Sequence, residues 1–586
     1  MSTAGKRTGT DISVEDLKRR ITVARGDEPG DLLLKNARLV DVFCGEVRES
    51  HVVVSGAFIA GIGESYTEGK QVLDLQGKYL LPGFIDGHVH VESSHVTLSE
   101  FARAVVPRGT TAVVIDPHEI ANVLGLNGIE YMLKASEGIP LDVFVMVPSC
   151  VPATLLETAG ASLGEDEIAQ ALKYDRVLGL GEMMNFPGVI FGTPEVLGKL
   201  VISSKSGVVI DGHAPRVAGP ELNAYVTAGI GSDHECTTRE EAEAKLRLGM
   251  RLMIREGSAA KNLAELLPVI NASTSRRCLF VTDDRHPEDL RVEGHMDHIL
   301  QKAVSLGLDP VMAVQLVTLH PAEYFGLKRR GAVAPGYIAD LVVVDDLKEF
   351  HVETVLKSGQ IVAQEGLIKS DIPFYSSDTV FESVHLPPLS EDSFRIEANG
   401  SKARVIGLIE NQIVTRHLVQ DVKTELGTIV SDPEEDVLKV AVIERHSGTG
   451  NIGLALVNGF GLKKGALASS VAHDAHNVIV VGVDDGDMVR AVQEIGRMGG
   501  GFVVVSDRDV GASLPLPVAG LMSDQPLETV CEGLDRVHQA ARDLGVRLDS
   551  PFTTLSFLAL PVIPELKVTD QGLVDVNTFQ IVDLFE

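Results

Sequence analysis

Histidine and acidic residues recur at the ends of short apolar runs in the first half of this chain. The clearest case is LPGFIDGHVHVESS, residues 81–94, where an apolar run and a Pro-Gly pair are followed by His88 and His90. Side chains two positions apart on a strand point to the same side, so these two imidazoles can share one metal ion. The pattern predicts the beginning of a metal site.

Further candidate ligands follow later apolar runs, and they are Glu182 in GLGEMMN, His213 in DGHAP, His234 in GSDHE, and Asp283 or Asp284 in FVTDD. Imidazole nitrogens and carboxylate oxygens are ordinary ligands of zinc, manganese and iron, and a carboxylate can bridge two ions. Any one of these histidines could instead be a hydrogen-bonded structural residue. Their joint occurrence, in register on five predicted strand ends, favours a metal site.

The elements that must position these residues alternate in type. From about residue 80 to 285 we count eight apolar runs of the kind seen in TTAVVIDPHE, separated by helix-like stretches such as LSEFARAVVPRG. Eight buried strands alternating with helices predict an α/β fold of the (β/α)8 TIM-barrel type, with reactive groups at the C-terminal ends of the strands. We expect this barrel over residues 81–330.

The segments on either side of the barrel predict two further domains. Residues 31–80 contain short β-type runs that predict a small antiparallel sheet, and residues 331–367 return to the same pattern. We expect both to form one small, β-sandwich-like domain, preceded by a polar segment at 1–30. A linker-like HLPPLSED begins the C-terminal region, 385–586, which predicts a separate α/β domain.

The composition predicts a soluble, cytoplasmic protein of several domains. No apolar stretch approaches the roughly 20 residues that a membrane span needs, and the polar N-terminus lacks the apolar region of a signal peptide. Five scattered cysteines indicate neither a disulfide framework nor a CxxC zinc site. A formal charge of −30 and the absence of tryptophan argue against nucleic acid as a partner. We expect a small, neutral or cationic substrate.

Longer segments carry a family resemblance. DVFCGEVRESHVVVSGAFIAGIGE…DLQGKYLLPGFIDGHVH and HPAEYFGLKRRGAVAPGYIADLVVVD resemble the opening and closing signatures of the amidohydrolase superfamily, over most of residues 31–345. Within it, PGFIDGHVHVESS, DPHEIANV, GLGEMMNFPGV, DGHAP and TDDRHPED resemble the metal-dependent adenine deaminase family of bacteria. The resemblance implies hydrolysis of adenine to hypoxanthine and ammonia, a purine salvage reaction.

The same resemblance distributes the candidate ligands over two divalent ions, of manganese, iron or zinc. It implies that His88, His90 and an aspartate after the eighth strand hold one ion. His213 and His234 would hold the other, and Glu182 would bridge the two. Many relatives use a carbamylated lysine as the bridge, which the glutamate makes unnecessary here.

The resemblance also implies roles in a mechanism. Superfamily practice favours Asp283 as the ligand and leaves Asp284 facing the substrate. Two metal ions lower the pKa of a shared water, and the hydroxide would attack C6 of adenine while Asp283 carries its proton to the departing amine. A ring nitrogen then needs a proton donor, and DPHEIAN offers Asp116, His118 and Glu119. We expect Glu119 to donate, if burial raises its pKa, with Asp116 as a further catalytic acid and His118 at the substrate.

The acids of DPHEIAN also have a structural interpretation, in which a turn at Asp116 leads into a helix whose first turn favours Glu119. GTGNIG, residues 448–453, matches GxGxxG, but its distance from the preceding strand argues against dinucleotide binding. VAHDAHNVIVVG contains His473, Asp474 and His476. We expect them to be structural, and we keep a third metal site and closure over the barrel mouth as hypotheses.

Other functions remain as alternatives. A cyclic-amide hydrolase of the dihydroorotase or hydantoinase kind could use the same metals, but it would usually bring a bridging lysine. A binding or scaffold protein on a decayed barrel should have lost ligands, and none is missing. A compact zinc nucleoside deaminase would need HxE…PCxxC, which is absent. A homodimer is compatible with the sequence.

Overall fold

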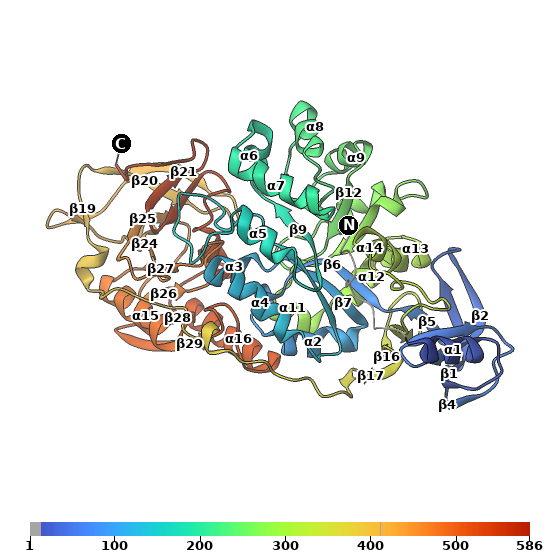
Figure 1. The fold of residues 1–586 in the computed structure, drawn as a ribbon. Coiled ribbons are helices and arrows are strands. Elements are labelled where there is room, and N and C mark those ends of the chain that lie inside the picture. Colours follow the sequence, from blue (N-terminus) through green and yellow to red (C-terminus); the bar gives the residue numbers. More distant parts are fainter. Residues whose placement is uncertain (1–12, 411, 586) are drawn as a thin grey trace.

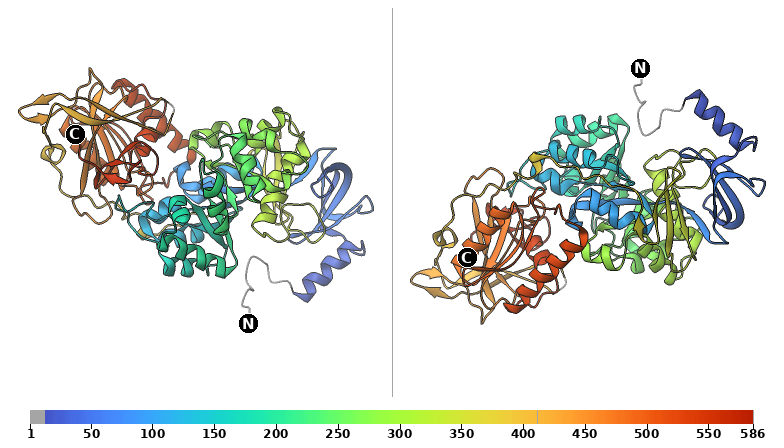
Figure 2. Two further views of the ribbon diagram at one scale, coloured as in Figure 1. Left: turned by 90° about the horizontal axis from the view of Figure 1, so that it is seen from above. Right: turned by 90° about the horizontal axis from the view of Figure 1, so that it is seen from below.

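The computed structural model describes residues 13–410 and 412–585, which form three bodies in a row. A small β domain lies at one end, a helix-covered barrel in the middle and a C-terminal domain at the other end (Figure 1). The views in Figure 2 show the same order. Within the predicted N-terminal segment, the described part contains helix α1 (Val14–Ala24), whose Val23 packs on the β domain.

Eight parallel strands form the barrel, which confirms the predicted fold class. Hydrogen bonds join β6 through β10 in one run and β11 through β13 in another. The N–H of Gly231 donates to the carbonyl of Ile210 over 2.9 Å between β10 and β11, and β14 (Asp283–Asp284) pairs with β6 to close the barrel. The strands are β6 (Phe84–His90), β7 (Thr110–Ile115), β8 (Asp142–Val147), β9 (Val177–Met183), β10 (Val209–Gly212), β11 (Ser232–Asp233), β12 (Arg251–Arg255) and β13 (Cys278–Val281).

Side chains of each strand alternate between the inside and the outside of the barrel. On β7, Ile115 joins the large core beneath the helices, whereas Val114 joins a second core that includes Phe325, just after α14 (Leu319–Tyr324). This second core fills the barrel interior. The polar side chains of the candidate site lie at the ends of the strands, beyond this apolar filling.

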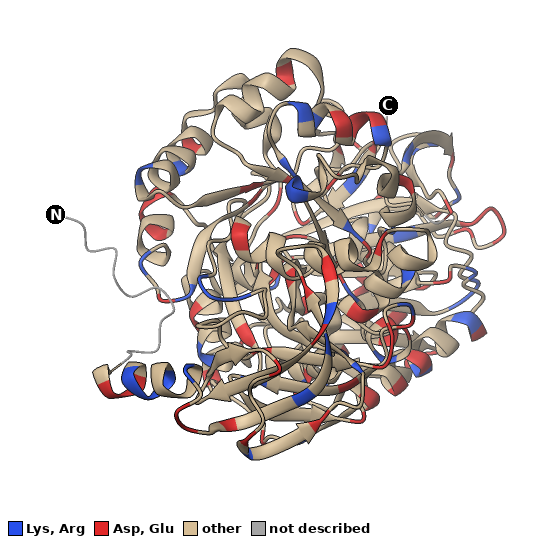
Figure 3. Ribbon diagram, turned by 90° about the vertical axis from the view of Figure 1, so that its right-hand side faces the viewer, with Lys and Arg blue, Asp and Glu red and all other residues tan. Residues whose placement is uncertain are grey.

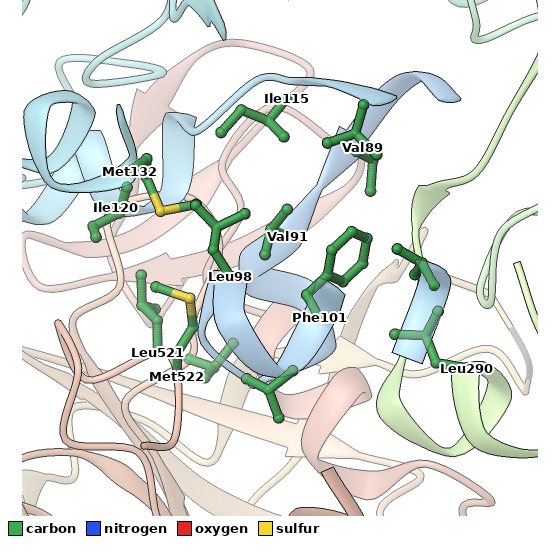
Figure 4. Packing of buried hydrophobic residues seen from close by; sticks show 14 of the residues in the cluster. Val89, Val91, Leu98, Phe101, Ile115, Ile120, Met132, Leu290, Leu521 and Met522 are labelled. Atoms are coloured by element: carbon green, nitrogen blue, oxygen red, sulfur yellow. The ribbon is translucent and has the colours of Figure 1, made fainter. Parts of the chain in front are cut away.

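Helices between the strands cover the outside of the barrel. The larger ones are α2 (Leu98–Val105), α4 (Leu126–Ala135), α7 (Pro194–Ser206), α8 (Gly219–Thr227), α9 (Arg239–Arg247) and α12 (Met296–Ser305). Figure 4 shows how α2 places Leu98 and Phe101 between the barrel strands and Leu521 and Met522 of the C-terminal domain. The barrel and the C-terminal domain therefore share one continuous apolar core.

The β domain is built from both flanks of the barrel. Its strands are β1 (Gly30–Asp41), β2 (Glu46–Ser55), β3 (Phe58–Ile62), β4 (Gly69–Asp74), β5 (Tyr79–Pro82), β15 (Leu341–Val344), β16 (Val352–Lys357), β17 (Gln360–Gln364) and β18 (Leu367–Ile368). Antiparallel pairing of β5 with β15 joins the two segments. Strands β1, β2, β5 and β15 line a common core.

This sheet is mixed, although the sequence of residues 31–80 predicts an antiparallel one. Strand β1 pairs in parallel with both β4 and β5. Alternating apolar residues indicate strands, but the direction of pairing depends on how the connections cross. The prediction of strands in residues 31–80 is therefore confirmed, whereas the predicted antiparallel direction is wrong for the pairing of β1 with β4 and with β5.

The C-terminal domain is a sheet between helices, in agreement with the predicted α/β class. Its strand order is β21 (Arg416–Asp421), β20 (Lys402–Gly407), β25 (Ile452–Asn458), β24 (Val437–Ile443), β27 (Val478–Gly482), β26 (Ala466–Ser469), β28 (Gly501–Ser506) and β29 (Asp509–Pro515). On β28, Val503 packs with α15 (Asp485–Met498), whereas Phe502 packs in the core that contains α16 (Leu527–Asp543) and the barrel. The α16 face therefore turns towards the barrel.

The glycine-rich segment 448–453 connects two antiparallel strands of this sheet, β24 and β25. A dinucleotide-binding loop would instead lead from a strand into a helix, where phosphate can meet the free N–H groups. The carboxylate of Glu444 accepts the backbone N–H groups of Ser447 and Thr449, each over 2.7 Å. The segment is a hairpin connection fixed by that acid.

Charged residues of the two signs are mixed along the chain. In the view of Figure 3, Lys and Arg are interspersed with Asp and Glu along the ribbon. None of the helices in the described part of the chain combines the length and the apolar character that a membrane span needs.

The shared core predicts that the two large domains depend on each other for stability. Leu521 is 1% exposed, and Leu521→Ala should lower the free energy of unfolding by about 2–5 kcal/mol because it leaves a cavity at the interface. Leu367→Ala, at a position that is 64% exposed, is the matched control and should cost little. Denaturant unfolding followed by circular dichroism measures both. Equal stability of the two variants would contradict the shared core.

Candidate metal centre

All six predicted metal ligands lie at the C-terminal ends of barrel strands, and their side chains converge. The residues form three overlapping groups, and within each group the potential ligand atoms lie within 4.8 Å of one another. The groups are His88, His234 and Asp283; His88, His90 and Glu182; and Glu182, His213 and His234.

Glu182, on β9, occupies the centre of this cluster. Its Oε2 lies 2.6 Å from Nδ1 of His213 and 3.2 Å from Nε2 of His234, and its Oε1 lies 3.4 Å from Nε2 of His90. Burial opposes ionisation of the carboxyl, but the charge of His234 and the hydrogen bond from His213 outweigh it and hold the pKa of Glu182 well below its usual range. Each carboxylate oxygen thus faces a different imidazole group, as a bridging ligand requires.

The two adjacent aspartates after β13 point in different directions. Oδ1 of Asp283 lies 3.2 Å from Nε2 of His90, and its Oδ2 accepts a hydrogen bond from Arg255 over 2.9 Å. Asp284 instead accepts a 2.6 Å hydrogen bond from the hydroxyl of Ser93. Asp283 has φ of 61°, in the left-handed region that aspartate tolerates better than most residues. This turn of the chain separates the two carboxylates.

The donor set fits divalent metal ions. Nε2 of His88 is buried and has no hydrogen-bond partner among the described residues, although it lies among the other candidate ligands. An unpaired buried polar atom costs free energy, and burial holds the pKa of His88 well below its usual value, so the ring is neutral and can coordinate a cation. Nδ1 of His90 forms a 2.8 Å hydrogen bond with the carbonyl of Asp116. This bond orients the ring so that Nε2 of His90 points into the cluster.

Asp116 and His118 are buried beside Glu182. Asp116 accepts the backbone N–H of Glu182 over 2.8 Å, and a side chain at Gly181 would collide with that carboxyl. Nδ1 of His118 lies 3.4 Å from Oε1 of Glu182. These contacts are those of residues that support or adjoin the cluster.

Glu119, in the first turn of α3 (His118–Leu124), lies beside the cluster in a buried position. Its Oε1 is 3.4 Å from the hydroxyl of Ser93 and 3.6 Å from Nδ1 of His473. Burial raises the pKa of Glu119 to about 8, with Asp284 adding to the effect and the charge of His473 opposing it. The carboxyl is therefore protonated at neutral pH.

Several residues at this site, including Ser93, Arg255 and Glu235, were not among the predicted ones. Ser93 connects Asp284 with Glu119, and Arg255 orients Asp283. Arg255 is the last residue of β12, so the strand-end rule that indicated the other residues could have found it. Ser93 follows the HVH motif in a short 3-10 turn, for which no periodic pattern gives a signal.

Family models cover both large domains. The model described as the amidohydrolase family matches residues 79–362, and the one described as the adenine deaminase C-terminal domain matches residues 412–580.

Known proteins resemble the chain over nearly its whole length. It is 51% identical to an adenine deaminase of Dehalococcoides mccartyi over 567 residues, which cover 97% of this chain and 99% of that protein. It is 52% identical to an adenine deaminase of Desulfatibacillum aliphaticivorans over 568 residues, with the same two coverages. A solved structure of N-isopropylammelide isopropylaminohydrolase from Burkholderia multivorans matches 57% of this chain and 99% of its own, at 19% identity and a TM-score of 0.44.

The barrel, its ligand-bearing strand ends and the matching family model define a metal-dependent amidohydrolase. Within that superfamily, the chain belongs to the adenine deaminase family.

The central place of Glu182 predicts that metal retention depends on its charge. Glu182→Gln keeps the shape of the side chain but removes its negative charge, and it should lower the metal content of the purified protein about tenfold or more. His298→Asn, on α12 outside the cluster, should leave the content unchanged. Elemental analysis after gel filtration measures both. Full metal content in Glu182→Gln would show that the ions bind elsewhere.

Proposed function

We propose that the protein hydrolyses adenine to hypoxanthine and ammonia at the cluster around Glu182. One observation carries the proposal. A set of side chains that could hold metal ions lies beside Glu119, an acid that is protonated at neutral pH, within a chain about half identical to adenine deaminases over nearly its full length. A protonated acid beside such a cluster suits a reaction that must add a proton to a ring as hydroxide attacks.

We infer that the cluster holds two divalent ions, of manganese, iron or zinc. Glu182 would lie between them, and the remaining ligands would be His88, His90 and Asp283 for one ion and His213 and His234 for the other. When bound, such ions lower the pKa of water and so supply hydroxide at neutral pH. The cyclic-amide hydrolase alternative is not favoured, because near-full-length relatives are adenine deaminases and Glu182 stands where a lysine would be expected.

In this proposal Asp283 moves a proton from the attacking hydroxide to the departing amine. The Arg255 guanidinium holds one carboxylate oxygen and leaves Oδ1 facing the imidazoles. Burial opposes ionisation, but His90 and Arg255 hold the pKa of Asp283 well below its usual range, so the carboxylate is ionised at neutral pH. Fixing one oxygen keeps the other in a constant position during the transfer.

Glu119 would donate the proton that the ring nitrogen needs, and Asp284 would contact the substrate from the opposite side of Ser93. Asp116 would act by holding the backbone of Glu182, a supporting role in place of the direct catalytic one that its motif suggests. Contact of His118 with the substrate stays a prediction, as do the cytoplasmic location, the place in purine salvage and the homodimer.

The reaction itself is tested with metal-stripped protein. Adding back manganese, iron or zinc should restore ammonia release from adenine, and a chelator should abolish it. A panel of aminopurines compares adenine with analogues substituted at N6. Undiminished activity without metal, or activity on a cyclic amide but not on adenine, would contradict the proposal.

The donor role of Glu119 predicts both a loss of rate and a pH dependence. Glu119→Gln should lower kcat by about 10²–10⁴ without lowering metal content, because the amide cannot supply the proton. In the unaltered protein the carboxyl is protonated below its pKa of about 8 and ionised above it, so kcat/KM should fall as the pH rises through about 8. Glu137→Gln, at an exposed position, is the control. An unchanged kcat in Glu119→Gln would exclude Glu119 as the donor.

A further inference from the structure

A loop of the C-terminal domain reaches the proposed catalytic acid. The segment after β26 carries His473, whose Nδ1 lies 3.6 Å from Oε1 of Glu119 on barrel helix α3. The two residues come from different domains, and both are largely buried, with side chains that are 14% and 2% exposed. The domain interface therefore brings an imidazole to an acid that the barrel alone would leave without it.

The imidazole of His473 is held in place from the side of its own domain. It stacks on Phe557, with ring centroids 4.6 Å apart and planes at 23°, and its backbone N–H donates to the hydroxyl of Ser556 over 3.3 Å. Asp474 Oδ1 lies 3.6 Å from the same Nδ1. The stacked ring therefore presents Nδ1 to two carboxyl groups, Asp474 from its own domain and Glu119 from the barrel.

Contacts around the loop fix the domains against each other at this point. Asn477 donates to the carbonyl of Thr158, in the loop after β8, over 2.8 Å, and the N–H of Thr158 donates to Asp570 over 2.8 Å. The N–H of Ser523 donates to the carbonyl of His95, after β6, over 2.8 Å. These bonds tie two loops at the barrel mouth to the C-terminal domain.

We propose that His473 is a positioning residue for the deamination, and that its imidazolium holds the Glu119 carboxyl and stabilises the carboxylate left when that acid gives its proton to the purine ring. The inference rests on the proposed function. In the step, the O–H bond of Glu119 breaks, its electron pair stays on the carboxyl oxygen, and the proton bonds the ring nitrogen. His473 stays protonated throughout. In this proposal the C-terminal domain contributes a positioning residue to the reaction.

The charges around the pair agree with this assignment. Burial disfavours the imidazolium, but the nearby carboxylate of Asp474 raises the pKa of His473 to about 9, so the ring is cationic at neutral pH. The other titratable groups that face the pair from neighbouring elements are Glu92, Asp284, His90, His95, His118, His286 and His476. Within the described part of the chain, the imidazolium of His473 lies at ion-pair distance from Glu119.

Glu119, His473 and His476 also satisfy the distances of a possible metal-binding group. Nδ1 of His476 accepts the N–H of Ala472 over 3.2 Å, and its Nε2 has no partner among the described residues. An ion at this place would need an ionised Glu119 and would remove the proton that the reaction requires. A third ion is therefore an outcome that the test must be able to detect.

The test begins with His473→Asn, which places an amide nitrogen near Nδ1 but removes the positive charge. It should lower kcat by roughly tenfold to 100-fold, with metal content unchanged. The cation lowers the pKa of Glu119, so its loss should raise that pKa and move the high-pH limb of kcat/KM to higher pH. His538→Asn is the matched control, because His538 also belongs to the C-terminal domain and stacks on a phenylalanine, Phe552, at 22°. It should keep both the rate and the pH profile.

A double-mutant cycle with Glu119→Gln separates positioning from a merely structural role. If His473 acts through Glu119, His473→Asn should cause little further loss of kcat in the Glu119→Gln background. Additive losses, an unshifted pH limb, or loss of one metal equivalent in His473→Asn would overturn the proposal. An unaltered protein that does not deaminate adenine would overturn the proposed function as well, whereas an active one with a fully active His473→Asn variant would overturn only the role of His473.

Discussion

The sharing of one buried carboxylate among several imidazoles is the constraint on which the site depends. Glu182 is 4% exposed, and an isolated anion so placed would cost several kcal/mol. His90, His213 and His234 compensate for that cost only because three different strand ends bring them within 3.4 Å of its oxygens. The closed barrel, with its interior filled by apolar side chains, is what holds those strand ends in register.

The same reasoning extends across the domain boundary. Helix α2 and Leu521 belong to one apolar core that packs the C-terminal domain on the barrel. In this packed arrangement His473 lies next to Glu119. One buried acid, Glu182, is kept ionised by neighbouring imidazoles, whereas Glu119 is kept neutral by burial. Two carboxyls of the same type thus receive opposite protonation states from their surroundings, which is the usual way in which acid and base chemistry coexist at one pH.

Much of this arrangement follows from local sequence patterns. Apolar runs that end in His88, Glu182 or Asp283 indicate both the barrel strands and the residues at their ends, because period and composition are local properties. The parallel pairing of β1 with β4, the orienting contact of Arg255 and the approach of His473 to Glu119 depend on how distant segments meet. Pattern reasoning could name His473 as a candidate, but only the packed domains show which residue it faces.

The most direct test of the central claim is the position of the metal ions themselves. A crystal structure of the manganese-loaded protein, with anomalous scattering recorded at the manganese edge, should show two peaks that flank the carboxylate of Glu182, each within coordination distance of its own histidines. Peaks at any other place, such as between Glu119 and His476, or a Glu182 carboxylate that touches no ion, would contradict the account.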